Sequence, residues 1–168
     1  MSLALRNVLF SVVVPGAGGV LVPWWILNSS GGGTPTPVAW YAVVVIAAGA
    51  VLYLACVSAF AVVGRGTPGP WDAPRRLVAV GPYRWVRNPI YLAALLAVLG
   101  EAWLFLSVPL LVYAGVMAIF FHLFVTGYEE RTLRRTFSES YEQYIRTVPR
   151  WIPRPPTRST GPRHTRRP

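Results

Sequence analysis

The stretch GPYRWVRNPIYLAALLAVLGEAWLFLSVPLLVYAGVMAIFFHLFV, from Gly81 to Val125, decides the fold of this chain. A short polar segment leads into two apolar runs, Ile90–Leu106 and Val108–Val125, with almost nothing between them. A transmembrane helix needs about 20 apolar residues, so each run is just long enough to cross a bilayer. The stretch therefore predicts a helical hairpin in a membrane, with its turn near Ser107 or, alternatively, within Gly100–Trp103.

Two further apolar runs, Val8–Leu27 and Val38–Val63, precede this hairpin. The first ends in Pro23-Trp24-Trp25 and lacks a small-residue cleavage site, which favours a retained span over a secretory signal. We expect an all-α integral membrane protein with four transmembrane helices, a cytoplasmic loop and a C-terminal amphipathic helix. Residues 1–152 would form one domain, and the Pro- and Arg-rich residues 153–168 a disordered basic tail that touches anionic lipid headgroups.

Composition supports a membrane setting. Of 168 residues, 54% are hydrophobic and only 13% are charged, which is too apolar for a soluble domain of this size. The net charge is +10, and every basic residue is arginine. The arginines flank the apolar runs, a pattern typical of membrane orientation and not of nucleic-acid binding. Cys56 is the single cysteine, so no intramolecular disulfide can form, and no metal site is expected.

The positions of the arginines predict the orientation. Five lie between Gly64 and Asn88 and ten follow Val125, whereas the segment Asn28–Pro37 carries no charge. Because arginine-rich connections stay in the cytoplasm, we expect a multi-pass protein of the inner (plasma) membrane with both termini cytoplasmic.

The predicted cytoplasmic helix spans roughly Thr126–Arg146. Its larger side chains recur at spacings of three and four and share one face: Glu130, Leu133, Phe137, Tyr141 and Tyr144. Another face carries Arg131, Arg135, Ser138 and Glu142. Such a helix could cover a site at the membrane surface.

Polar chemistry is concentrated at this membrane edge. Guanidiniums of Arg84 or Arg87 suit a carboxylate, and carboxylates of Glu129 or Glu130 suit an amine or a diol. The aromatic rings available for an apolar base or a cation are Tyr91, Tyr141 and Tyr144. Simpler interpretations stay open, because the arginines could be membrane anchors and the carboxylates could lie in the first turn of a helix.

The segment GPYRWVRNPIY, the hairpin and the later EERTLRRTFSESYEQYIRTVPRWIP resemble the superfamily of isoprenylcysteine carboxyl methyltransferases and phospholipid methyltransferases. The resemblance implies an integral membrane enzyme that uses S-adenosyl-L-methionine to methylate a lipid-like or isoprenoid-like acceptor at the cytoplasmic face. It implies the following cofactor-binding residues: Tyr83, Arg84, Arg87, Asn88, Pro89, Tyr91, Glu129, Glu130, Tyr141 and Tyr144. Arg87, Asn88 and His122 are the catalytic candidates.

Three positions depart from the superfamily's common pattern. Asn88 stands where histidine is usual, Ala93 where glycine is frequent, and Ser138 where glycine usually follows the phenylalanine. His122, Thr126 and Glu129 are spaced four and three apart and therefore predict a stripe toward the site, along which an acceptor could pass. Two alternative functions stay open: an NADPH-dependent membrane reductase of the sterol-reductase type, and a non-catalytic membrane scaffold.

Overall fold

The computed structural model describes residues 16–35, 39–64 and 77–156. Within these ranges the chain is helical and contains no β-strand, in agreement with the expected all-α fold. The elements, with η marking 3-10 and π-helices, are η1 (Ala17–Leu21), α2 (Val22–Ser29), α3 (Ala39–Ala59), η2 (Phe60–Gly64), η3 (Gly81–Arg84), α4 (Pro89–Leu104), α5 (Val108–Phe124), η4 (Val125–Glu129) and α6 (Glu130–Thr147).

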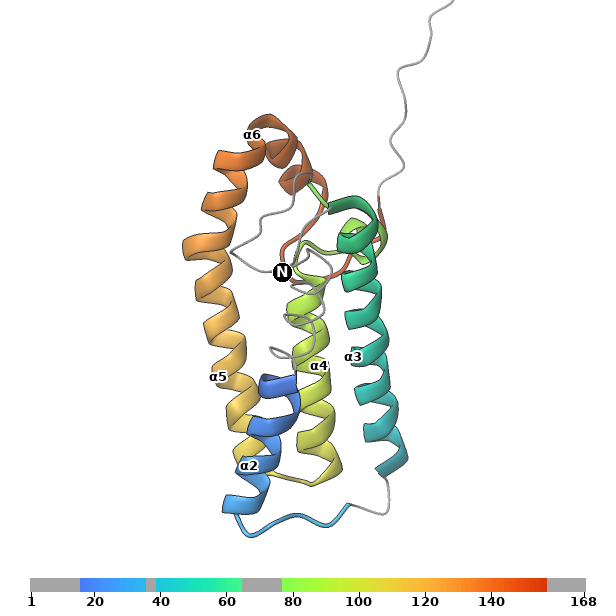
Figure 1. Cartoon of the computed structure of the whole chain (residues 1–168), viewed down its shortest axis with the longest axis vertical. Coiled ribbons are helices and arrows are strands. Elements are labelled where there is room, and N and C mark those ends of the chain that lie inside the picture. The colour runs from blue at the N-terminus through green and yellow to red at the C-terminus, as the bar shows by residue number, and fades with distance from the viewer. Residues whose placement is uncertain (1–15, 36–38, 65–76, 157–168) are drawn as a thin grey trace, which may run out of the picture.

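Among the described helices, α3 and α4 pack most extensively and lie side by side (Figure 1). Two glycines allow this approach. A Cβ atom at Gly49 of α3 would lie 2.8 Å from the carbonyl oxygen of Ala93, and one at Gly100 of α4 would lie 3.1 Å from the carbonyl oxygen of Ala42. Close backbone contact through small residues is typical of helix pairs in membranes.

Helices α4 and α5 form the expected hairpin. The turn comprises residues 105–107, where Leu106 adopts a positive φ of 45° and the Ser107 hydroxyl accepts a hydrogen bond from the Leu110 amide at 3.4 Å. Ser107 thus caps α5. The alternative turn within Gly100–Trp103 is wrong, because these residues lie inside α4.

The chain is helical without interruption from α5 through η4 into α6. The backbone of Phe124, Glu129 and Glu130 is right-handed helical, so the two glutamates do not begin a free helix. Their interpretation as first-turn charges that offset a helix dipole is therefore wrong. The expectation of one regular helix over Thr126–Arg146 also needs correction. Ser138 has φ 42° and ψ −114°, and α6 bends there.

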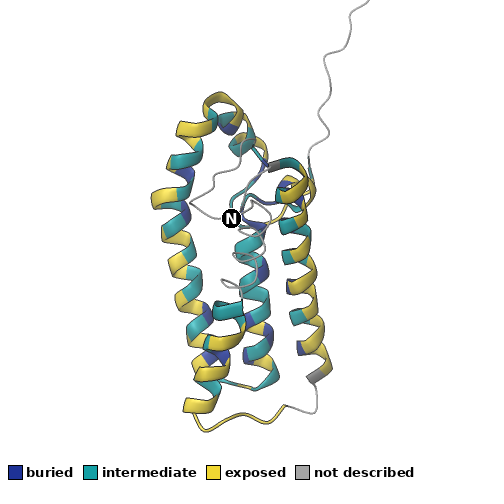
Figure 2. Ribbon diagram, viewed as in Figure 1, coloured by how far each residue is buried: buried dark blue, intermediate teal, exposed yellow. Residues whose placement is uncertain are grey.

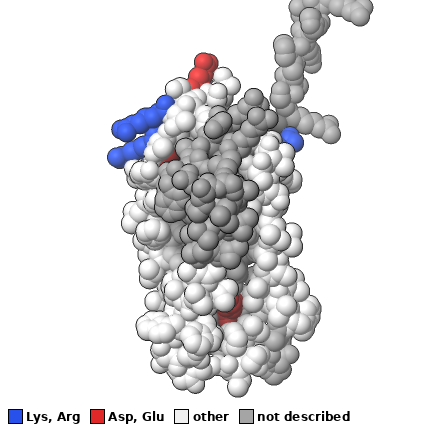
Figure 3. Space-filling model, in the orientation of Figure 1, with Lys and Arg blue, Asp and Glu red and all other residues white. Residues whose placement is uncertain are grey.

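Apolar side chains cover the outside of the bundle. Exposed residues run along the outer sides of α3 and α5 (Figure 2), and they include Val44, Leu54, Val112, Ile119 and Leu123. Continuous apolar surface of this kind marks a membrane or a partner interface. In the space-filling view the arginine side chains lie toward the end of the molecule that carries α6 (Figure 3).

Two helices in the described ranges are long and apolar enough to cross a membrane, Trp40–Val63 and Val108–Thr147. The second has 40 residues; a straight helix of that length would be about 60 Å long, twice the thickness of the hydrocarbon core, so only part of it can span. Helix α4 is apolar but shorter. The expected first span, residues 8–27, begins outside the described residues and ends within α2.

Candidate functional site

The polar site is built on the segment that joins α3 to α4. Gly81 has φ 56°, a left-handed conformation that suits glycine, and it starts the 3-10 helix η3. Tyr83 of η3 is buried against Cys56 and Phe60 of the α3–η2 segment. The Tyr144 hydroxyl of α6 donates to the Tyr83 carbonyl oxygen at 2.7 Å. These contacts fix the segment between the end of α3 and the end of α6.

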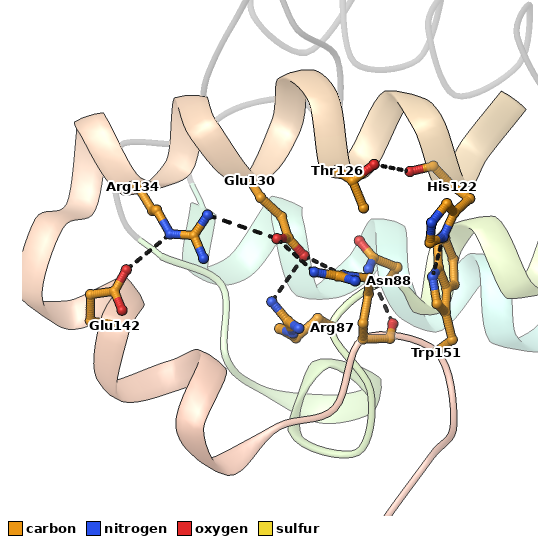
Figure 4. Close-up of polar contacts among 9 residues, drawn as sticks. Arg87, Asn88, His122, Thr126, Glu130, Arg134, Glu142 and Trp151 are labelled. Atoms are coloured by element: carbon orange, nitrogen blue, oxygen red, sulfur yellow. Dashed lines mark hydrogen bonds and ion pairs between the residues drawn. The ribbon is translucent and has the colours of Figure 1, made fainter.

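Arg87 and Glu130 meet at the centre of the site, as Figure 4 shows. The Arg87 Nη1 donates to Glu130 Oε1 at 3.0 Å, and the Glu130 residue is only 4% exposed. Arg150 adds a two-pronged contact, with Nε 2.6 Å from Oε1 and Nη2 3.1 Å from Oε2. Arg134 lies 4.0 Å from the second oxygen. One carboxylate is thus shared by three guanidiniums from separate parts of the chain.

This arrangement keeps Glu130 ionised. Burial alone would raise the pKa of the Glu130 carboxyl, but the hydrogen bonds from Arg150 and the charges of Arg87, Arg150 and Arg134 outweigh it and lower that pKa. The same pairing raises the pKa of the Arg150 guanidinium. The contact is therefore a stable ion pair that joins α6, the segment before α4 and the chain after α6.

Glu129 has a different partner. Its Oε2 accepts a hydrogen bond from the Tyr91 hydroxyl of α4 at 2.8 Å, and the Tyr91 ring packs on Phe121 with centroids 4.7 Å apart. Burial raises the pKa of the Glu129 carboxyl, the Tyr91 hydrogen bond lowers it, and the adjacent Glu130 raises it, with a net upward shift. Glu129 is thus a half-buried carboxylate with no ion-pair partner among the described residues.

The two tyrosines of α6 line the same region. Tyr141 is buried at 2% exposure, and its ring centroid lies 6.2 Å from that of Tyr144. Burial raises the pKa of both phenols, so both stay neutral and act as hydrogen-bonding aromatic walls. The kink at Ser138 turns this part of α6 back, which also allows Arg134 to pair with Glu142 at 3.0 Å despite their separation of eight residues.

Asn88 and Pro89 lie at the start of α4, where proline suits the first helical turn. The Asn88 side-chain amide is buried and donates to the carbonyl oxygen of Arg150 at 3.1 Å. Asn88 therefore binds the chain after α6. Arg84, by contrast, is exposed on η3 and forms no ion pair with a described acidic side chain.

His122 meets a residue that the sequence reasoning missed. The Trp151 indole N–H donates to His122 Nδ1 at 3.2 Å, and the rings are 6.2 Å apart. Arg150 was also missed. The sequence signal that could have found both residues is the Pro-Arg-Trp triplet 149–151, a few residues after the predicted helix. Thr126 Oγ1 donates to the His122 carbonyl oxygen at 2.7 Å and so stays with its own helix.

The chain after α6 is hydrogen-bonded to the segment before α4. The Arg87 amide donates to the Pro149 carbonyl oxygen at 2.9 Å, and the Arg154 amide donates to the Trp85 carbonyl oxygen at 2.9 Å. Arg154, which belongs to the expected tail of residues 153–168, is thus hydrogen-bonded to the segment before α4. Residues 157–168 lie outside the described ranges.

No group of three or more histidine, cysteine or acidic side chains in the described ranges could hold a metal ion. An open, shallow pocket of about 330 Å³ lies at the far end of the bundle beside the α4–α5 turn and is lined by apolar residues such as Leu99, Trp103 and Leu111. Because it contains none of the polar groups above, we place the candidate site at the Glu130 end instead.

The sequence model of the phospholipid methyltransferase family matches residues 38–140, from α3 to the second half of α6. The chain belongs to the phospholipid methyltransferase family. It is therefore a methyltransferase of a membrane-type family, and this family acts on lipid-like substrates. No curated protein and no solved structure matches the chain.

Proposed function

We propose that this phospholipid methyltransferase family member transfers a methyl group from S-adenosyl-L-methionine to a lipid-like acceptor at the cytoplasmic face of the membrane. The observation that carries the proposal is the convergence of two polar segments at one end of an apolar bundle. Arg87 and Tyr91, from the start of α4, meet Glu130 and Glu129 from the middle of a continuous helix. A membrane anchor would not require these side chains to be buried together.

The residues present fit the cofactor's chemistry. Glu129 can accept hydrogen bonds from an amine or a ribose diol, because only the Tyr91 hydroxyl contacts it among the described side chains. The Arg87 Nε is buried without a hydrogen-bond partner within the described ranges, which leaves a donor for a carboxylate. The rings of Tyr141 and Tyr144 offer aromatic faces to an adenine or a cation.

When bound, the cofactor supplies a methyl group on a positively charged sulfur. The chain's own residues bind and orient, because methyl transfer by direct displacement depends mainly on alignment. Tyr141 and the bent second half of α6 close the site against water. Asn88 takes no part in proton transfer, since a carboxamide does not titrate and its N–H is directed at the Arg150 carbonyl. The acceptor must therefore reach the site already able to attack the methyl group, as a carboxylate, a neutral amine or a thiolate would.

The acceptor reaches this site from the bilayer. The cofactor is water-soluble and enters from the cytoplasm, so a lipid has to approach laterally between helices. Tyr91 and Phe121 mark the apolar side of the site, between α4 and α5. The full topology belongs to the same proposal: four spans in one domain over residues 1–152, both termini in the cytoplasm, in the plasma membrane.

Calorimetric titration of the purified protein tests the cofactor directly. S-adenosyl-L-methionine and its demethylated product should bind, and NADPH should not. Arg87→Ala should weaken binding by about ten- to a hundredfold, the loss expected for a charge-assisted hydrogen bond. Arg135→Ala is the control, because Arg135 is exposed on α6. Tight binding of NADPH, or unchanged affinity in a folded Arg87→Ala protein, would contradict the proposal.

Transfer of a radiolabelled methyl group identifies the acceptor. Extracted membrane lipids and small isoprenoid acids and thiols should be offered separately to the protein in bilayer nanodiscs. Label in the lipid fraction is the expected result. Absence of label from every fraction, despite cofactor binding, would leave a cofactor-binding scaffold and refute the activity.

A further inference from the structure

The chain after α6 forms a second connection across the candidate site. From Val148 to Arg154 it lies beside the segment Trp85–Asn88. The Arg87 amide binds the Pro149 carbonyl at one end, and the Arg154 amide binds the Trp85 carbonyl at the other, both at 2.9 Å. Between them the Asn88 side chain binds the Arg150 carbonyl at 3.1 Å. We call residues 148–154 the strap.

Side chains fasten the strap on both sides. Arg150 donates hydrogen bonds to both oxygens of Glu130, from Nε to Oε1 at 2.6 Å and from Nη2 to Oε2 at 3.1 Å. This planar bidentate geometry is one that only arginine offers. Trp151 donates its indole N–H to His122 on α5 at 3.2 Å, and Val148 is buried. Figure 4 shows the chain after α6 passing beside Asn88 and reaching Trp151 next to His122.

Because of the strap, the two adjacent glutamates have different partners. Glu130 has its two oxygens taken up by Arg87 and Arg150, whereas Glu129 contacts only the Tyr91 hydroxyl among the described side chains. The Arg87 guanidinium is held by the same carboxylate that holds Arg150, and its main chain is held by Pro149. The strap therefore sets the position of Arg87 from two directions.

We propose that the strap completes the site, that Arg150 is a positioning residue which holds Arg87 and Glu130 in place, and that Glu129 is the carboxylate left for the ligand. The role of the strap stands on the contacts of this chain alone. The role of Arg150 in ligand binding rests on the proposed function. In this chain Asn88 anchors the strap, because its side-chain N–H donates to the Arg150 carbonyl oxygen. A carboxamide is neutral, so this hydrogen bond does not depend on pH.

Hydrogen exchange measured by mass spectrometry tests the strap without a ligand. The probes are the peptides that contain the Arg87 and Arg154 amides, both of which are bonded across the strap. Arg150→Ala should accelerate exchange at both amides at least tenfold, and Arg150→Lys should do so less, because lysine keeps the charge but loses the fork. Arg135→Ala is the control and should change neither peptide. Unchanged exchange in Arg150→Ala would overturn the strap.

Calorimetric titration with S-adenosyl-L-methionine on the same four proteins tests positioning. Affinity should fall about tenfold in Arg150→Ala, recover partly in Arg150→Lys, and stay within twofold of wild type in Arg135→Ala. Faster exchange with unchanged affinity would overturn the positioning role of Arg150. Failure of the wild type to bind would refute the proposed function and this role together, while the exchange result would still decide the strap.

Discussion

Glu129 and Glu130 are neighbours in the chain, but their carboxylates have opposite surroundings. Glu130 is ionised among arginines, and its pKa is lowered. Glu129 is half-buried beside the Tyr91 phenol, and its pKa is raised. At pH values above the pKa of the unfolded state, a carboxyl whose folded-state pKa is lowered stabilises the protein, and one whose folded-state pKa is raised destabilises it. Glu130 and Glu129 should therefore affect folding with opposite sign.

We therefore predict that Glu130→Gln lowers the free energy of unfolding at pH 8 by about 1.5–3 kcal/mol, the cost of charged hydrogen bonds lost in the interior. Glu129→Gln should leave it unchanged or raise it, since the amide oxygen can still accept the Tyr91 hydrogen bond. Thermal unfolding in detergent measures both. The Glu130 contribution should disappear as the pH falls below about 4, near the unfolded pKa. The Glu129 cost should grow as the pH rises from there through the raised pKa.

Ser138 carries local strain. Its φ of 42° and ψ of −114° lie in a region that glycine tolerates and other residues rarely adopt. Such a conformation costs about 1–3 kcal/mol in a non-glycine residue. Ser138→Gly should therefore raise the unfolding temperature, and Ser138→Val should lower it.

Ser140, two residues later, provides the control for that test. It is exposed and lies within the regular part of α6. Glycine there should destabilise by about 0.5–1 kcal/mol, as in any helix interior. Equal responses of the two serines to glycine would show that the bend at Ser138 is not strained in solution.

At the scale of helices, the α3–α4 contact depends on Gly49. An added methyl group would lie 2.8 Å from the Ala93 carbonyl oxygen and 3.0 Å from the Ala97 nitrogen, and these backbone atoms cannot turn aside. Gly49→Ala should destabilise the protein by about 1–3 kcal/mol through overpacking. Chemical unfolding measures the change. Gly115→Ala on α5 is the matched control, because nothing lies within 4 Å of its Cβ position, and it should be neutral or stabilising.

For the whole molecule, the arginine distribution predicts which end faces the cytoplasm. Single cysteines at Ser30 and Thr67, in a Cys56→Ala background, test this orientation with a membrane-impermeant thiol reagent. Position 30 should be labelled in intact cells, and position 67 only after the cells are opened. Labelling of position 67 from outside would reverse the orientation and place the candidate site on the wrong face for a cytoplasmic cofactor.

Sequence patterns alone determined the helical architecture and the location of the polar site. Apolar runs give a continuous signal for helices in a membrane, and α3, α4 and α5 lie where they were expected within a few residues. Charged and aromatic residues beside such runs are conspicuous, which is why Arg87, Tyr91 and the two glutamates could be selected. The residue pattern could not say which of the two glutamates pairs with which partner.

The tertiary structure alone decided the partners and the strap. Arg150 and Glu130 are 20 residues apart, and Asn88 and Arg150 are 62 apart. No local periodicity records a contact between such distant positions, because it depends on the bend at Ser138 and on the path of the chain after α6. A Pro- and Arg-rich composition indicated disorder for that chain. The buried carboxylate of Glu130 and the free main-chain groups of residues 85–88 hold its first part in place instead.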